Sequence, residues 1–265
     1  LFYGDLKEFL VVPILINVML RLENVSKAFG GVKAVQGCEF SIEPKRITAL
    51  IGPNGAGKTT VFNLVCGFFP VDAGMIHFTD EDITRAPIWK RSRLGLARTF
   101  QLSRTFKNLS IEDNLLLSVR QDDDQFFSMC VRGQAQDDQE KQQILEMMKF
   151  VGLEKSPQTP VTDLSYGQQK LFDLTRALLN PHTLLMLDEP VAGINPVLRE
   201  RFKELLLSLK QKGETIFLIE HDMDFVRAVA DWVIVMDQGS VLTQGAPQTV
   251  LSDPRVLEAY LGPAL

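Results

Sequence analysis

Residues 52–60 decide the fold of this chain, because they match the phosphate-binding pattern G-x-x-x-x-G-K-[ST]. In order they are Gly52, Pro53, Asn54, Gly55, Ala56, Gly57, Lys58, Thr59 and Thr60. An apolar run precedes them at residues 47–51, and a helix-like run follows at residues 61–66. This strand–loop–helix context separates a true P-loop from a glycine-rich turn. Glycines let backbone N–H groups wrap closely around phosphates at a helix N-terminus. We therefore expect a nucleotide site in which Lys58 reaches the outer phosphates and Thr59 ligates Mg²⁺.

The bulk composition fits one large α/β domain. The chain has 265 residues, of which 45% are hydrophobic and 23% charged, which is ordinary for a globular protein. Its net charge of −5 argues against binding nucleic acid, which needs a basic surface. The cysteines Cys38, Cys66 and Cys130 form no C-x-x-C pair, so they indicate neither a disulfide framework nor a zinc site, and they fit a reducing cytoplasm.

Two kinds of strand pattern are present. Residues 21–25 and 37–42 alternate between apolar and polar side chains, as half-buried antiparallel strands do. Residues 47–51, 184–187, 216–219 and 233–236 are nearly continuous apolar runs, as expected of strands that are buried on both faces. Helical segments separate these runs, which predicts a parallel sheet with crossover helices.

Residues from about 85 to 164 are more polar than the segments around them and show helical spacing, which predicts a helical insertion. Helical spacing is visible at 111–119 and 139–151, and the acidic run at 122–124 is typical of a solvated loop. A further helix is predicted over residues 196–212, where Gly213 would end it.

Two carboxylates follow the apolar run at 184–187. Asp188 would end a buried strand, where a carboxylate without a cation is costly, so it fits a ligand of Mg²⁺ through water. Glu189 comes next and is our choice for the general base that polarises the attacking water. The alternative interpretation is an acidic helix-capping pair before Pro190.

The order of the remaining motifs resembles that of the ATP-binding cassette (ABC) ATPases. Residues 164–169 read Leu-Ser-Tyr-Gly-Gln-Gln, residues 184–190 read Leu-Leu-Met-Leu-Asp-Glu-Pro, and residues 219–222 read Ile-Glu-His-Asp. Each string is weak alone, but their joint order after a P-loop is specific, and the resemblance covers roughly residues 19–261. It implies an α/β P-loop NTPase cassette with a parallel-sheet core, an N-terminal antiparallel β-subdomain and an inserted helical subdomain that meets a membrane partner.

The resemblance also implies roles for single residues. Gln101 matches the glutamine loop that touches Mg²⁺ or the attacking water, and His221 takes the switch position that reaches the γ-phosphate. Phe29 stands where the family stacks an aromatic ring on adenine; a core phenylalanine is the rival interpretation. The implied catalytic residues are Glu189, His221, Gln101 and Lys58, the implied Mg²⁺ ligands are Thr59, Gln101 and Asp188, and the implied signature residues that bind γ-phosphate are Ser165, Gly167 and Gln168.

Two positions depart from the family pattern. Tyr166 replaces the first glycine of the LSGGQ signature, and Asn195 stands where many cassettes carry the aspartate of the D-loop. These departures leave open how the two nucleotide sites communicate. In the family, a complete site combines the P-loop of one cassette with the signature of another. Because this chain has one of each, it is expected to pair with a copy of itself or with a homologue.

Residues 98–101, 188–196, 219–223 and 253–262 are similar to the ATP-binding subunits of bacterial branched-chain (hydrophobic) amino acid importers. Close neighbours serve urea import and lipopolysaccharide export. This resemblance implies integral membrane permeases as partners, a periplasmic solute-binding protein as an indirect partner, and a peripheral position at the cytoplasmic face of the inner membrane. Two rivals remain: a soluble ABC ATPase of translation or DNA repair, and a catalytically silent partner cassette.

The first 18 residues are interpreted as an extension outside the cassette, which would occupy residues 19–265. The apolar segment within them is shorter than the roughly 20 residues that a spanning helix needs. The alternative is an extra apolar segment that lies on the fold or on a partner.

Overall fold

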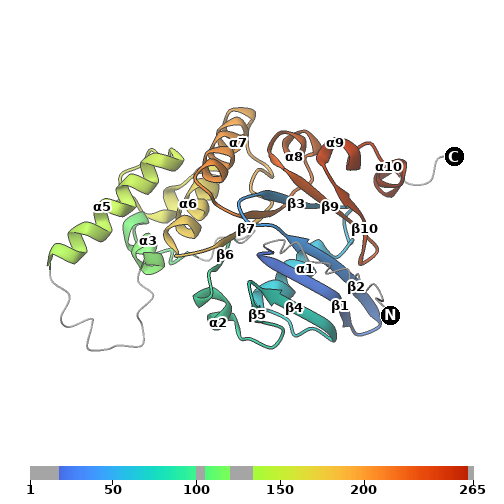
Figure 1. Cartoon of the computed structure of the whole chain (residues 1–265). Coiled ribbons are helices and arrows are strands. Elements are labelled where there is room, and N and C mark those ends of the chain that lie inside the picture. The colour runs from blue at the N-terminus through green and yellow to red at the C-terminus, as the bar shows by residue number, and fades with distance from the viewer. Residues whose placement is uncertain (1–17, 100–104, 120–133, 262–265) are drawn as a thin grey trace, which may run out of the picture.

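Two β-sheets pack around a central helix in the computed structural model of this chain (Figure 1). The structure describes residues 18–99, 105–119 and 134–261. The larger sheet has six strands in the order β10-β9-β3-β8-β7-β6. Their bounds are Ile47–Ile51 (β3), Leu96–Arg98 (β6), Leu184–Asp188 (β7), Ile216–Ile219 (β8), Trp232–Asp237 (β9) and Ser240–Gly245 (β10). The strands from β9 to β6 are parallel, and β10 is antiparallel to β9.

The smaller sheet has four antiparallel strands in the order β2-β1-β4-β5. Their bounds are Leu20–Phe29 (β1), Val32–Ile42 (β2), Ala73–Phe78 (β4) and Glu81–Asp82 (β5). The P-loop helix α1, Lys58–Cys66, shares a hydrophobic cluster with residues of both sheets. The P-loop is therefore supported on both sides by packed elements.

The helices fall into two groups along the chain. Those that follow the P-loop half are α2 (Ile88–Arg93), α3 (Ile111–Val119), α5 (Gln134–Val151) and the short 3-10 turn Val161–Asp163. Those of the C-terminal half are α6 (Tyr166–Leu179), α7 (Pro196–Gln211), α8 (Met223–Val229), α9 (Pro247–Val250) and α10 (Pro254–Leu261). Figure 1 shows α3, α5 and α6 grouped beyond one edge of the large sheet.

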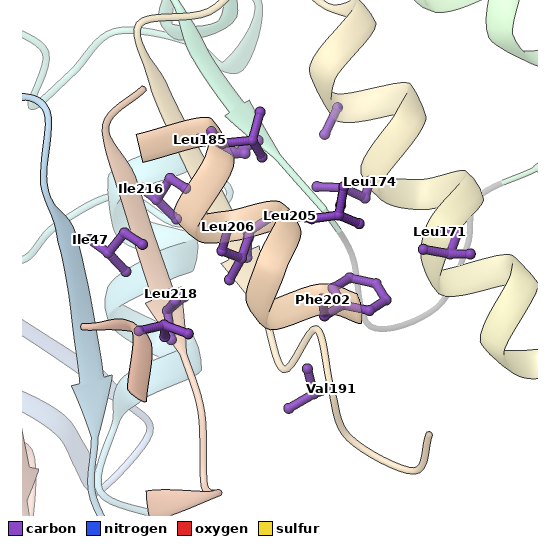
Figure 2. Packing of buried hydrophobic residues seen from close by; sticks show 14 of the residues in the cluster. Ile47, Leu171, Leu174, Leu185, Val191, Phe202, Leu205, Leu206, Ile216 and Leu218 are labelled. Atoms are coloured by element: carbon purple, nitrogen blue, oxygen red, sulfur yellow. The ribbon is translucent and has the colours of Figure 1, made fainter. Parts of the chain in front are cut away.

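The two faces of the large sheet bury different clusters, because successive strand residues point to opposite faces. Leu50 and Phe217 pack with α1 and the small sheet, whereas Ile47 and Leu218 pack with α6, α7 and α8. Figure 2 shows α7 on this second face, with Phe202 pointing toward α6 and toward the loop after β7. The sheet thus separates α1 from α6, which carry different parts of the expected site.

The predicted strands and helices are largely confirmed. The parallel core, the antiparallel N-terminal sheet and the helices at 111–119 and 196–212 are present, the last ending at Gln211. The expected start of the insertion at about residue 85 was too early, because Leu96–Arg98 form β6 of the core sheet. The helix expected at 139–151 begins at Gln134, and β4, β5, β6 and β10 were not predicted.

Among the described residues, none of the helices combines the length and the apolar character needed to cross a bilayer. Residues 1–17 lie outside the described part of the chain, so the expectation for the N-terminal extension stays a prediction.

Candidate nucleotide site

The P-loop runs so close to its neighbours that two of its positions require glycine. A Cβ on Gly52, at φ +149°, would lie 2.1 Å from the carbonyl oxygen of Met236. A Cβ on Gly57, at φ +99°, would lie 2.4 Å from the carbonyl oxygen of Ala34. Both conformations are ones that L side chains rarely adopt. The loop is therefore held between β9 and β2.

Lys58, the first residue of α1, folds back onto this loop. Its Nζ donates hydrogen bonds to the carbonyl oxygens of Gly52 at 2.7 Å and Pro53 at 2.9 Å. The side chain is buried, and this burial lowers the pKa of Lys58, against the opposing effect of the nearby carboxylates Glu189 and Asp188. A cation held at the mouth of a loop of backbone N–H groups suits the outer phosphates of a nucleotide.

Asp188 ends β7 and is held on one side by an arginine. Its Oδ2 accepts a hydrogen bond from Nη2 of Arg98 at 2.8 Å, and both side chains are buried. Its Oδ1 is also buried, but within the described part of the chain it has no hydrogen-bond partner. Burial raises the pKa of Asp188, although Arg98 opposes the shift. An unpartnered buried carboxylate oxygen calls for an explanation, and a metal-bound water would supply the missing donor.

Glu189 adopts a backbone conformation that is rare for a residue with a side chain, with φ +50°. Its N–H donates to the carbonyl of Ile219 at 3.0 Å, and its carbonyl accepts from Nζ of Lys170 at 2.7 Å. Its side chain lies 2.8 Å from Nε2 of His221. These contacts bring together two of the predicted catalytic residues at the ends of neighbouring strands, β7 and β8.

Two residues that contact the predicted site were not singled out by sequence reasoning. Glu220 is buried, and its two oxygens accept hydrogen bonds from the N–H groups of Val191 at 2.9 Å and His221 at 3.1 Å. Burial raises the pKa of Glu220, against these hydrogen bonds. Arg98 joins Asp188 to Asn63 of α1, whose Oδ1 accepts from Nη1 at 2.7 Å. An acidic residue next to His221 in an apolar run was the available signal for Glu220. Arg98 stood only within the stretch 98–101 that resembles the family, and nothing in the sequence pointed to its contact with Asp188.

The signature residues lie at the start of α6. Ser165 caps the helix: its hydroxyl accepts from the N–H of Gln168, and the Gln168 side chain accepts from the N–H of Ser165. Gly167 lies tightly against α7, because a Cβ there would be 2.5 Å from Leu198. These residues line a groove of about 1010 Å³ shared with residues of α5 and of the loop before α7.

The structure does not bring the signature to the P-loop. None of the described residues that line the signature groove belongs to residues 52–60. The two motifs also lie on elements that cover opposite faces of the large sheet (Figure 1). One chain therefore does not enclose a nucleotide between them.

Phe29, at the end of β1, is 41% exposed, so the rival interpretation as a core residue was wrong. Its ring meets Phe69 edge-on at 5.0 Å between centroids, and Nζ of Lys27 lies 5.4 Å from its centre. An exposed aromatic ring of this kind can stack on a base, so adenine stacking stays a prediction. Gln101 lies outside the described residues, just after Arg98 and Thr99.

The fold and this site define a class: an α/β P-loop nucleotide-binding protein, with an acidic pair and a histidine at the ends of β7 and β8, the two strands that follow the P-loop strand β3 in the sheet order. A family model described as ABC transporter matches residues 35–192, more than half of the chain. A second, described as branched-chain amino acid ATP-binding cassette transporter, matches residues 240–262. The chain belongs to the ABC transporter family, and it is an ATP-hydrolysing cassette.

Individual relatives agree with this. The chain is 36% identical over 245 residues to a probable branched-chain amino acid transport ATP-binding protein, LivG, of Archaeoglobus fulgidus, which covers 92% of this chain and 95% of that protein. It is also 36% identical over 251 residues to the high-affinity branched-chain amino acid transport ATP-binding protein BraF of Pseudomonas aeruginosa, covering 93% and 98%. A crystal structure of a nucleotide-free ATP-binding cassette from an ABC transporter superimposes with a TM-score of 0.81 at 32% identity, covering 93% and 100%.

Proposed function

We propose that this chain is the ATPase subunit that powers import of branched-chain or other hydrophobic amino acids through a membrane ABC transporter. One observation carries the ATPase assignment at residue level. The unpartnered buried Oδ1 of Asp188 and the Glu189–His221 pair lie at the ends of β7 and β8, and β8 lies between β7 and the P-loop strand β3. The amino acid assignment is supported by the match at residues 240–262 and by the relatives named above.

The residues present fit a magnesium ion bound with ATP. Asp188 would hold it through a water at Oδ1, and the hydroxyl of Thr59, in the first turn of α1, would be a direct ligand. The sequence resemblance adds Gln101 to these expected ligands of the ion. The ion would neutralise charge on the phosphates. Lys58 contributes the mobile cation: it exchanges the carbonyl oxygens of Gly52 and Pro53 for phosphate oxygens.

Glu189 takes the role of general base. Its carboxylate accepts a proton from the attacking water, and His221, 2.8 Å from Oε1, orients that carboxylate. In this proposal His221 also contacts the γ-phosphate, as the family resemblance implies. The N–H group of His221 is fixed by Glu220, which holds the switch residue in register with the base.

A second cassette completes the site in this proposal. The separation of Ser165, Gly167 and Gln168 from the P-loop supports a head-to-tail dimer with a copy or a homologue, in which the signature of one chain binds the γ-phosphate held by the other. The cassette pair would sit at the cytoplasmic face of the inner membrane against integral permeases, fed indirectly by a periplasmic solute-binding protein. Nucleic acid has no part in this proposal.

Two measurements test the proposal. Glu189→Gln should keep ATP binding, slow hydrolysis by roughly 10²–10⁴-fold and accumulate an ATP-bound dimer on size exclusion. Hydrolysis at the parental rate would transfer the role of base to another residue. The complete transporter, reconstituted in proteoliposomes, should take up labelled leucine, isoleucine or valine. Failure with all three would overturn the substrate assignment, and a cassette for urea import or lipopolysaccharide export would then be next.

A further inference from the structure

Two side chains of α6 reach the loop between β7 and α7, residues 189–195. Nζ of Lys170 donates to the carbonyl of Glu189 at 2.7 Å, and the hydroxyl of Tyr166 donates to the carbonyl of Ala192 at 3.1 Å. The tyrosine ring also lies against Gly193, where a Cβ would be 3.2 Å from it. Tyr166 and Lys170 are four residues apart, so they share one face of the helix.

The residue that Lys170 holds is strained. Glu189 has φ +50°, and a left-handed backbone is unfavourable for a residue with a Cβ. Such a conformation persists only where its surroundings impose it. The hydrogen bond from Lys170 fixes the direction of the Glu189 carbonyl, and with it the direction in which the Glu189 side chain leaves the backbone toward His221.

The other side of the same loop is held by the core. Oε1 of buried Glu220 accepts from the N–H of Val191, and Val191 itself is buried beside Phe202 (Figure 2). The loop is therefore fixed at its middle by the core, while α6 fixes Glu189 and Ala192 on either side. The helix α6, which makes two of these contacts, also carries the signature at its N-terminus.

We propose that α6 positions the general base of its own chain, with Lys170 and Tyr166 as positioning residues. The inference rests on the proposed function, which gives the base role to Glu189 and binding of a second nucleotide to the start of α6. When Ser165 contacts a phosphate of the nucleotide held by the other cassette, that contact is linked, through about one and a half turns of α6, to the base at the chain's own site. The tyrosine that departs from the family signature is part of this link.

Steady-state kinetics of purified variants test the link. Lys170→Met should lower kcat for ATP hydrolysis about tenfold, the contribution of one charge-assisted hydrogen bond. KM should not change, and neither should the calorimetric affinity of the chain for ATP. Tyr166→Phe should lower kcat in the same direction by less, and Lys170→Arg should restore most of the rate. Lys203→Met, which removes a partly exposed lysine of α7 paired with Glu200, is the matched control and should leave kcat unchanged.

Binding and dimerisation separate positioning from other roles. In a Glu189→Gln background, Lys170→Met should still give the ATP-bound dimer on size exclusion, because Ser165 and Gly167 are intact. A parental kcat for Lys170→Met would overturn the proposal, as would loss of the dimer or of ATP affinity, since Lys170 would then act in binding. Hydrolysis by Glu189→Gln alone at the parental rate would instead overturn the proposed base, whatever the result at Lys170.

Discussion

Replacing Arg98 by methionine should destabilise the fold by leaving a buried charge without its partner. Arg98 and Asp188 are 7% and 2% exposed, and their contact is 2.8 Å. Removing one member of a buried ion pair costs about 3–5 kcal/mol, because the other charge stays desolvated. Against a total stability of about 5–15 kcal/mol this is a large share. For a domain of this size it corresponds to a fall in Tm of about 10 °C.

The physical reasoning predicts a specific rescue. Asp188→Asn added to Arg98→Met should recover most of the loss, because the uncompensated carboxylate is gone, with a coupling energy of at least about 2 kcal/mol in the double-mutant cycle. Denaturant unfolding measures all three variants in the absence of nucleotide. Arg46→Met is the control: Arg46 pairs with Glu43 at 2.8 Å at an exposed site, and its loss should cost no more than about 1 kcal/mol.

Two results would refute this account of the buried pair. One is a loss below about 1 kcal/mol for Arg98→Met, which would place the pair among exposed salt bridges. The other is additivity of Arg98→Met and Asp188→Asn, because residues that share a contact should show coupling.

Three further predictions concern separate parts of the chain. Lys58→Ala should abolish most ATP binding by calorimetry, because the phosphates lose their mobile cation; binding as tight as the parent's would refute the P-loop assignment. Gln101→Ala should reduce leucine uptake by the whole transporter more than ATP binding by the isolated subunit; normal uptake would refute a coupling role. Burial alone would lower the pKa of His182, but its contacts with Glu214 and the carbonyl of Asn180 raise it overall. The His182–Glu214 pair therefore stabilises the fold at low pH, and this stabilisation is lost as pH rises through the raised pKa of His182. Glu214→Gln should lower the free energy of unfolding by about 1 kcal/mol at pH 6 and by little at pH 9. An equal loss at both pH values would refute this prediction.

The sequence alone predicted the elements whose signals are local. The P-loop pattern lies between an apolar run and a helix, and the structure places β3 and α1 there. The strands that begin at Leu184 and Ile216 were predicted because a strand buried on both faces is apolar throughout. The order of motifs was enough to indicate the family.

Strands with weak local signals were not predicted. Three residues form β6, too few to show a period, and they belong to the core only because β7 pairs with them. Half of the residues of β4 are exposed, and β10 has no fully buried residue. They are strands because they pair with β1 and β9. The sequence of a strand does not by itself indicate which other strand it pairs with.

The chain's own residues determined which groups the site contains, because phosphate binding, metal ligation and proton transfer each need particular side chains in a recognisable order. Only the tertiary structure decided how those groups are held. Arg98 meets Asp188 across 90 positions, Lys170 meets the carbonyl of Glu189 across 19, and His221 meets Glu189 across 32. Such contacts follow from the pairing of β6, β7 and β8 and from the packing of α6 beside them. A local sequence pattern cannot predict these contacts, because it indicates which secondary structure a segment prefers and not which distant segment it will contact.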